Sequence, residues 1–263
     1  MSRVLAIANQ KGGVGKTTTA INLAAALAAN DLRVLVIDSD PQGNASTGLG
    51  IAKDPERPSL YHVILGDSPA RDAIVPTEFE GLFLISADKN LVGANLELVD
   101  IPDREYRLRQ RIAEIREEYR YIIIDCPPAL DLLTLNALIA ADSVLVPIQC
   151  EFFALEGISE LMDTIDRIGE SFHHPLRIEG ILLTMFDDRT NLMRQVAADL
   201  KEFFQDQIFR TVIPRSIRLA EAPSFGKPIL SYDPRSRGAE SYIQLAKEIL
   251  DHEQNRESAQ GAG

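Results

Sequence analysis

The chain has 263 residues, of which 45% are hydrophobic, and a formal net charge of −12. This content suits one large α/β domain or two small ones, and the acidic charge argues against indiscriminate binding to nucleic acid. Cys126 and Cys150 are too few for a disulfide framework and lack metal-ligand spacing, so we expect two buried free thiols. We predict neither a signal peptide nor a membrane-spanning stretch, which leads us to expect a cytoplasmic protein.

A glycine-rich segment near the start separates an apolar run at residues 4–8 from an alanine-rich stretch at 20–29. This order predicts a strand, a tight loop and a helix. Gly12, Gly13 and Gly15 allow the loop to turn with its N–H groups inward, and the start of the helix adds its positive dipole end. The segment therefore predicts a phosphate cradle.

Two lysines accompany these glycines. Lys16 would reach the β- and γ-phosphates of a nucleotide, and the hydroxyl of Thr17 would ligate Mg²⁺. The usual P-loop spacing would place a glycine at Gln10, where this sequence has none, and Lys11 follows instead. A glycine-rich turn with two solvated lysines is the simpler alternative, but the flanking strand and helix favour a nucleotide site.

Carboxylates follow two other apolar runs. Asp38 and Asp40 end the predicted strand at 34–37, and Asp125 ends the one at 121–124. Uninterrupted apolar runs are typical of parallel sheets, whose functional groups lie at the carboxyl ends of the strands. Asp125 stands where P-loop proteins hold Mg²⁺. Asp38 and Asp40 could instead form a polar turn before Pro41, although two carboxylates there favour metal and water chemistry.

The remaining segments continue the alternation of strand and helix. We predict strands at 82–85, 144–148, 178–184 and 208–213, and helices at 60–65, 104–119, 132–141, 154–168, 192–204 and 239–251. With no linker-like stretch, this predicts an α/β fold with one doubly wound, mostly parallel sheet and helices on both faces. We expect a single domain over residues 1–252 and a flexible polar tail at 253–263.

Positive charge is concentrated in one window. Residues 210–237 hold six arginines and lysines against two acidic residues, a local charge of +4 that leaves −16 for the rest of the chain. A local basic patch is therefore compatible with the acidic total.

Taken together, these motifs resemble the ParA/Soj family of chromosome- and plasmid-partitioning ATPases, which belong to the deviant Walker A branch of P-loop NTPases. The likeness covers residues 3 to about 249. Its pieces are KGGVGKTT at 11–18, DSDPQGN at 38–44, IDCPP at 124–128, QCEFFALEG at 149–157, EAPS at 221–224 and YDPRSRGAE at 232–240. Ser216 departs from the asparagine expected in many relatives, which could alter base or ribose contacts.

The resemblance implies an ATP-dependent homodimer that binds nonspecific double-stranded DNA, associates with the nucleoid, and hydrolyses ATP with Mg²⁺ when a ParB/Spo0J-type partner stimulates it. Lys11 would cross into the partner subunit's site and act in catalysis with Lys16 and Asp40, the last orienting the attacking water. Thr17, Asp38 and Asp125 would support Mg²⁺. ATP would contact Lys11, Gly12, Gly13, Val14, Gly15, Lys16, Thr17, Thr18, Pro214 and Ser216, and DNA would contact Arg189 and Arg218.

Three alternatives compete with this interpretation. A membrane-cycling relative of the MinD type would end in a basic amphipathic helix, which residues 253–259 do not resemble. An iron–sulfur ATPase would need cluster cysteines in loops, and a small-molecule kinase would need an acceptor motif that we do not find. Arg189 follows two aspartates and Arg218 lies near Glu221, so local salt bridges could also account for both arginines.

Overall fold

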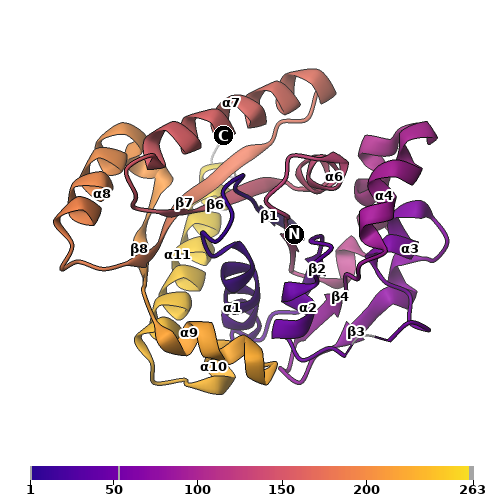
Figure 1. The fold of residues 1–263 in the computed structure, drawn as a ribbon, viewed down its shortest axis with the longest axis horizontal. Coiled ribbons are helices and arrows are strands. Elements are labelled where there is room, and N and C mark those ends of the chain that lie inside the picture. Colours follow the sequence, from indigo (N-terminus) through magenta and orange to yellow (C-terminus); the bar gives the residue numbers. More distant parts are fainter. Residues whose placement is uncertain (1, 53, 261–263) are drawn as a thin grey trace.

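The computed structural model describes residues 2–52 and 54–260. Within these residues, eight strands form one sheet in the order β3-β4-β2-β5-β1-β6-β7-β8, with β1 near its centre (Figure 1). The strands are β1 (Arg3–Ile7), β2 (Val34–Asp38), β3 (Ile74–Pro76), β4 (Leu82–Ile85), β5 (Tyr121–Asp125), β6 (Ser143–Gln149), β7 (Arg177–Phe186) and β8 (Ile208–Pro214). Among the described strands, β3 at one edge pairs antiparallel with β4, and the other pairs are parallel. The predicted mostly parallel sheet is confirmed.

Helices cover both faces of this sheet, as predicted (Figure 1). They are α1 (Lys16–Ala28), α2 (Asn44–Gly48), α3 (Leu60–Leu65), α4 (Leu91–Glu97), α5 (Arg107–Ala113), α6 (Leu132–Ala140), α7 (Ala154–Phe172), α8 (Asn191–Phe204), α9 (Ile217–Glu221), α10 (Ile229–Tyr232) and α11 (Arg237–Gln260). One core layer contains α1 and α11, and the other contains α6, α7 and α8.

The sequence of β1 shows why both layers form. Val4 and Ala6 belong to the layer of α6–α8, whereas Leu5 and Ile7 belong to the layer of α1 and α11. Successive side chains of a strand point to opposite faces, so an uninterrupted apolar run must be covered on both sides. Because β1, β2, β5 and β6 run parallel, their carboxyl ends meet at one edge of the sheet.

Several regions differ from the sequence-based prediction. Strand β3 was not predicted because it is only three residues long and half-exposed. The helix expected at 104–119 is shorter: α5 is flanked by 3₁₀ turns at Arg104–Tyr106 and Arg116–Glu118. Residues 217–232 form α9, a 3₁₀ turn at Ala222–Phe225 and α10, none long enough to show helical periodicity in sequence.

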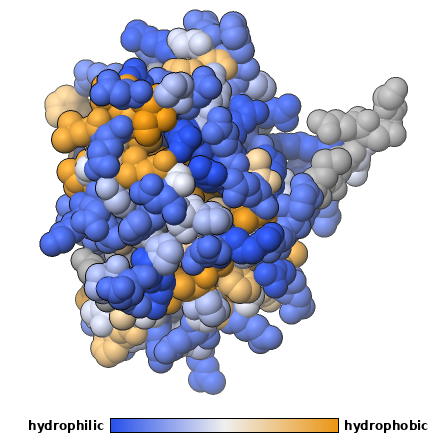
Figure 2. All heavy atoms as spheres, turned by 90° about the vertical axis from the view of Figure 1, so that its right-hand side faces the viewer, coloured by the Kyte–Doolittle hydropathy of each residue, from blue (hydrophilic) through white to orange (hydrophobic). Residues whose placement is uncertain are grey.

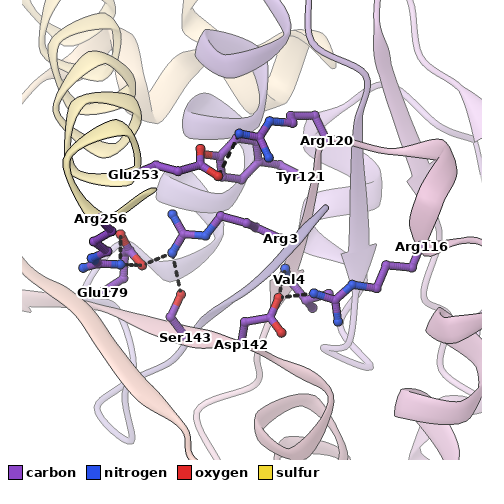
Figure 3. Close-up of polar contacts among 10 residues, drawn as sticks. All are labelled: Arg3, Val4, Arg116, Arg120, Tyr121, Asp142, Ser143, Glu179, Glu253 and Arg256. Carbon is purple, nitrogen blue, oxygen red and sulfur yellow. Dashed lines mark hydrogen bonds and ion pairs between the residues drawn. The ribbon is translucent and has the colours of Figure 1, made fainter. Parts of the chain in front are cut away.

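The structure differs from the prediction of a flexible tail at 253–263 as far as it describes that stretch, up to residue 260. Helix α11 continues to Gln260 instead of ending near residue 251. Glu253 is buried, accepts a hydrogen bond of 2.7 Å from the Tyr121 hydroxyl and forms an ion pair with Arg120 (Figure 3). Residues 261–263 of the expected tail lie outside the described residues.

A second buried carboxylate holds the same helix. Glu179 on β7 forms ion pairs with Arg256 on α11 and with Arg3 on β1 (Figure 3). Burial alone would raise the pKa of Glu179, but the two guanidinium groups hold it below its usual value. These contacts explain why a polar stretch remains helical: its charged side chains meet partners far away in the sequence.

Candidate nucleotide-binding site

The loop between β1 and α1 has the backbone of a phosphate cradle. Gly13 and Gly15 adopt left-handed conformations, with φ of 75° and 91°. A Cβ atom at Gly15 would meet no atom closer than 3.8 Å, so the backbone conformation, not lack of space, requires glycine there. Among the described residues no side chain caps α1, which leaves the N–H groups of its first turn available to an anion.

Two polar side chains that the sequence analysis did not select support this loop. Asn9 donates to the carbonyl of Pro147 at 2.7 Å and accepts from the backbone N–H of Lys11 at 2.9 Å. The Thr184 hydroxyl, from the end of β7, donates to the carbonyl of Val14 at 2.7 Å. Both are buried, so the loop is fixed to β6 and β7 as well as to α1. In the sequence, only their position near the ends of predicted strands could have indicated that Asn9 and Thr184 support the loop.

Lys16 is the first residue of α1 and lies almost entirely inside the cradle. Its side chain is buried and its Nζ donates to the carbonyl of Lys11 at 3.0 Å. Burial lowers the pKa of Lys16, and the carboxylates of Asp125 and Asp40 only partly oppose that effect. A phosphate bound in the loop would supply the negative charge that favours the protonated amine.

The predicted metal-supporting aspartates lie side by side. Asp38 and Asp125 are paired residues on the neighbouring strands β2 and β5, and both are fully buried. Asp38 accepts hydrogen bonds from the N–H and hydroxyl of Ser46, at 2.8 and 2.7 Å. Burial raises the pKa of Asp38 to about 6 despite these bonds. Ser46, on α2, is a supporting residue that the sequence analysis missed.

Asp125 has the features of a magnesium-supporting carboxylate. Neither of its oxygens has a hydrogen-bond partner among the described residues. Burial and the neighbouring Asp38 raise its pKa well above the usual value, and the nearby Thr17 hydroxyl offsets this only in part. Within residues 2–52 and 54–260 no cluster of three or more His, Cys, Asp or Glu forms a metal site. The residues fit Mg²⁺, which often takes one or two carboxylates together with substrate phosphates.

The raised pKa of Asp38 predicts an unusual pH dependence of stability. Between pH 3.8 and about 6 the folded protein keeps the proton of Asp38 while the unfolded chain loses it, so the free energy of unfolding falls as pH rises. Urea denaturation of nucleotide-free protein from pH 4 to 7 measures it. Asp38→Asn should reduce the slope of this part of the profile, while Asp125, whose pKa burial also raises, keeps the rest of it. Parallel profiles for wild type and variant would contradict the prediction.

Asp40 and Lys11 lie at the same edge but in different environments. Asp40 is mostly buried and its Oδ1 accepts from the N–H of Gln42 at 2.9 Å. Lys11 is half-exposed and forms an ion pair with Glu151, just beyond the end of β6. The structure thus places Lys16 inside the cradle and Lys11 at its rim. The assigned roles in catalysis remain predictions.

Pro214 and Ser216 lie next to the cradle. Both line a cavity of about 100 Å³ together with Gly15 and Thr18. The Ser216 hydroxyl accepts a hydrogen bond of 3.4 Å from the N–H of Leu219 and so caps α9. Serine at this position therefore has a structural role in the helix start, and its contact with adenosine stays a prediction.

The two arginines predicted to contact DNA both have carboxylate partners. Arg189 is 85% exposed and forms an ion pair with Asp187, whose pKa it lowers to about 2. Arg218 is 57% exposed and pairs with Glu221 at 3.1 Å and with Asp233 at 3.5 Å. The local salt bridges considered from the sequence are therefore present. Exposed pairs of this kind contribute little to stability, so both arginines remain accessible to phosphate.

Comparison with known proteins decides the family of this site. A family model described as an AAA domain matches residues 2–178. The chain is 54% identical over 258 residues to the chromosome partitioning protein ParA of Caulobacter vibrioides, covering 97% of both chains. It is 53% identical over 249 residues to the sporulation initiation inhibitor protein Soj of Bacillus subtilis, covering 95% of this chain and 98% of Soj. The chain belongs to the ParA/Soj family.

The fold comparison agrees with this assignment. A structure of cobyrinic acid a,c-diamide synthase from Mycobacterium smegmatis, solved with an ATP analogue and magnesium, superposes with a TM-score of 0.85. That protein is 37% identical, and the match covers 97% of this chain and 96% of the other. Membership in the ParA/Soj family confirms the prediction of a P-loop ATPase that uses ATP and Mg²⁺.

Proposed function

We propose that the protein is an ATP-dependent dimerising switch in chromosome or plasmid segregation. Its ATP-bound dimer binds DNA without sequence preference, and a ParB/Spo0J-type partner stimulates hydrolysis and release. The observation that carries this proposal is the pair of lysines at one loop: Lys16 is buried in the cradle, while Lys11 stands half-exposed at its rim. A rim lysine can reach a nucleotide bound to a facing subunit. The protein would act in the cytoplasm, in association with the nucleoid.

The chemistry follows from the positions of the buried groups. The first-turn N–H groups of α1 and the ammonium of Lys16 bind the phosphates. Because the fold already holds these groups in position, they need little rearrangement when the nucleotide binds. Bound Mg²⁺ would neutralise charge on the phosphate oxygens, and Thr17, Asp38 and Asp125 would support it, the two aspartates from paired positions on neighbouring strands. Asp40, at the same edge, orients the attacking water. Lys11 from the facing subunit completes the neutralisation of charge, as an arginine finger does in trans.

Replacement of Lys11 tests the role of the rim lysine. In Lys11→Ala we expect ATP binding by the monomer to persist, because Lys16 and the backbone cradle remain, whereas ATP-dependent dimerisation and hydrolysis are lost. Light scattering with and without ATP measures the dimer, and calorimetry measures binding. Lys89→Ala, which removes a lysine outside the loop, is the matched control. A dimer of normal stability in Lys11→Ala would mean that Lys11 acts within its own subunit.

Charge reversal tests the proposed DNA contacts. In Arg189→Glu and Arg218→Glu we expect DNA binding to be abolished while ATP binding and dimerisation persist, because an acidic protein holds a polyanion only where cations cluster. Removal of one phosphate-binding cation should reduce the slope of log K against log salt by about 0.9. Gel shifts on nonspecific duplex across a salt series measure both quantities. Dimeric variants with the wild-type salt slope would place the DNA surface elsewhere.

The alternative of a MinD-type membrane-cycling ATPase uses the same nucleotide chemistry but a different surface. None of the described helices is long and apolar enough to cross a bilayer, which leaves peripheral attachment as the form this alternative would take. Pelleting with anionic liposomes beside a gel shift on plasmid DNA, each with and without ATP, separates the two functions. We expect ATP-dependent binding to DNA and none to liposomes.

A further inference from the structure

A chain of polar contacts joins the first turn of α1 to Arg218. The side-chain amide of Asn22 donates to the carbonyl of Thr18 at 2.7 Å, and its oxygen accepts from the backbone N–H of Ile229 at 2.7 Å. The carbonyl of Ile229 accepts from the N–H of Asp233 at 2.8 Å. The carboxylate of Asp233 lies 3.5 Å from the Nε of Arg218. Because Thr18 lines the cavity beside the phosphate loop, these contacts run from the nucleotide site to a proposed DNA contact.

The middle of this chain of contacts is buried. Asn22 is 2% exposed, and Ile229, which lies 207 residues further along the sequence, is fully buried. Ile229 is the first residue of α10, so its N–H has no partner within that helix. If Asn22 moved alone, this buried N–H would lose its acceptor, which is unfavourable. The amide of Asn22 therefore holds α10 to α1.

Asn22 also stands out in the sequence of α1. Residues 20–29 read AINLAAALAA, in which it is the one polar side chain, and residues 19–28 of the helix are buried. Alanine has a higher helix propensity than asparagine and would suit such a stretch better. The bond to Ile229 explains why a polar residue is present there.

A second contact holds the same part of the chain, segment 217–232, to α2. A Cβ atom at Gly226 would come within 2.6 Å of the Cα of Gly50, so the two backbones touch there. Gly50 lies two residues after the end of α2, and Ser46 of α2 donates to Asp38. Figure 1 shows α9 and α10 beside α1 and α2. Segment 217–232 thus contacts both the helix that begins at the phosphate loop and the helix that holds a metal-supporting carboxylate.

The charge of Arg218 is set by its carboxylate partners. Besides Asp233, the guanidinium pairs with Glu221 at 3.1 Å, and Glu221 also accepts from the hydroxyl of Tyr232 at 3.2 Å. A cation beside two carboxylates attracts phosphate less strongly than a cation alone, and the attraction changes with the distances between the charges. A shift of α10 changes these distances, because Asp233 is bonded to the first residue of that helix.

We propose that Asn22 is a positioning residue that couples nucleotide binding to DNA binding. Phosphates bound at the first turn of α1 fix the position of Thr18, and Asn22 makes the position of α10 depend on it. The partners of Arg218 shift with α10, so the charge that faces DNA depends on the bound nucleotide. This role rests on the proposed function, because it requires DNA binding that depends on ATP.

Such coupling is reciprocal. If ATP raises the affinity for DNA by some factor, DNA raises the affinity for ATP by the same factor. Loss of the coupling residue lowers both factors together. A defect that only distorts the DNA surface weakens DNA binding equally with and without ATP and leaves the factor unchanged. Measurement of both affinities therefore distinguishes coupling from a merely structural role.

Two substitutions break the chain of contacts. Asn22→Ala removes both bonds of the amide, whereas Asn22→Ser keeps a hydroxyl that can bond to the carbonyl of Thr18 one turn back but is too short to reach Ile229. Asn30→Ala is the matched control. At the exposed end of the same helix, the amide of Asn30 donates to the carbonyl of Ala26 at 2.8 Å, four residues back, as Asn22 does to Thr18.

A second control changes a different surface. Figure 2 shows hydrophobic side chains gathered on the upper part of one face of the molecule, the side on which α4 lies in Figure 1. Leu96 on α4 is 77% exposed, and α4 packs in the core layer opposite to that of Ile229. Leu96→Ser should therefore leave the coupling unchanged.

We expect both Asn22 variants to form the ATP-dependent dimer and, without DNA, to bind ATP as the wild type does. With ATP, their affinity for nonspecific duplex should be about tenfold lower, and the rise in ATP affinity caused by DNA should shrink by the same factor. Fluorescence anisotropy of labelled duplex with ATP, with ADP and without nucleotide measures the first quantity. Titration of a fluorescent, non-hydrolysable ATP analogue with and without duplex measures the second, and light scattering measures the dimer.

The outcomes separate this role from the proposed function. Coupling factors of wild-type size in the Asn22 variants, or equal weakening of DNA binding with and without ATP, would overturn the role of Asn22. Loss of the ATP-dependent dimer in folded Asn22→Ser would also overturn it, because Asn22 would then support the nucleotide site itself. Absence of ATP-dependent DNA binding in the wild type would instead overturn the proposed function.

Discussion

Lys16→Ala should abolish nucleotide binding. The ammonium is buried in the phosphate loop, where burial lowers its pKa and the carbonyl of Lys11 is its hydrogen-bond partner. A charge-assisted bond to each of two phosphates contributes about 3 kcal/mol or more in total, so the affinity for ATP should fall at least about 100-fold. Isothermal titration calorimetry with ATP and Mg²⁺ measures the change. The backbone cradle alone cannot offset the charge of the phosphates.

The control for this variant is Lys201→Ala, which removes an exposed lysine near the end of α8. It should bind ATP as the wild type does, and both variants should show the wild-type circular dichroism spectrum. An unchanged ATP affinity in folded Lys16→Ala would exclude this loop as the nucleotide site, and with it the proposed mechanism.

Asp40→Ala should stop hydrolysis and accumulate the ATP-bound dimer. The substitution removes the carboxylate that orients water but keeps the phosphate loop, Thr17, Asp38 and Asp125. The hydrolysis rate should fall by about two to four orders of magnitude, the usual contribution of a positioned general base. Single-turnover hydrolysis over long incubation measures the rate, and sedimentation in ATP measures the dimer.

Asp199→Ala, which removes an exposed carboxylate on α8, is the matched control and should hydrolyse ATP normally. The structure also offers an internal comparison, because Asp38 is fixed by two hydrogen bonds from Ser46 whereas Asp40 is held by the N–H of Gln42. Loss of Mg²⁺-dependent nucleotide binding in Asp40→Ala would mean that the roles of Asp38 and Asp40 have been exchanged.

The sheet could be predicted from sequence because its strands are buried on both faces. The run Tyr121–Asp125 is apolar up to a terminal carboxylate. Strands β1, β2 and β6 are likewise mostly apolar and buried along their length, as expected for strands covered on both faces. Short elements gave no such signal. Strand β3 has three residues, and α9 and α10 have five and four, fewer than two turns of a helix.

The continuation of the C-terminal helix beyond residue 251 was missed for a different reason. Residues after 251 are polar, and polarity at a chain end is the usual sign of fraying. Here Glu253 and Arg256 instead pair with Arg120 and Glu179, more than 70 residues away in sequence. Contacts of this range depend on the tertiary fold, so no local pattern could have shown them.

The sequence predicted those residues of the candidate nucleotide site that directly follow a strand. The glycine loop and the aspartates at 38, 40 and 125 lie at one edge because parallel strands place their carboxyl ends together. The residues that support them, Ser46, Asn9 and Thr184, were not selected, since a single serine, asparagine or threonine is common at loops and helix starts. Their importance depends on the hydrogen bonds that the fold creates.

Under the proposed function, ATP switches this acidic protein into a form that binds DNA. A gel shift on nonspecific duplex DNA, performed with wild-type protein in ATP and Mg²⁺, in ADP and Mg²⁺, and without nucleotide, tests it most directly. We predict a salt-sensitive shift in ATP and Mg²⁺ but not in ADP and Mg²⁺ or without nucleotide. Lys16→Ala should show no shift in any of the three conditions. Equal binding in all three conditions, or no binding in ATP by a protein that forms the dimer, would contradict the claim.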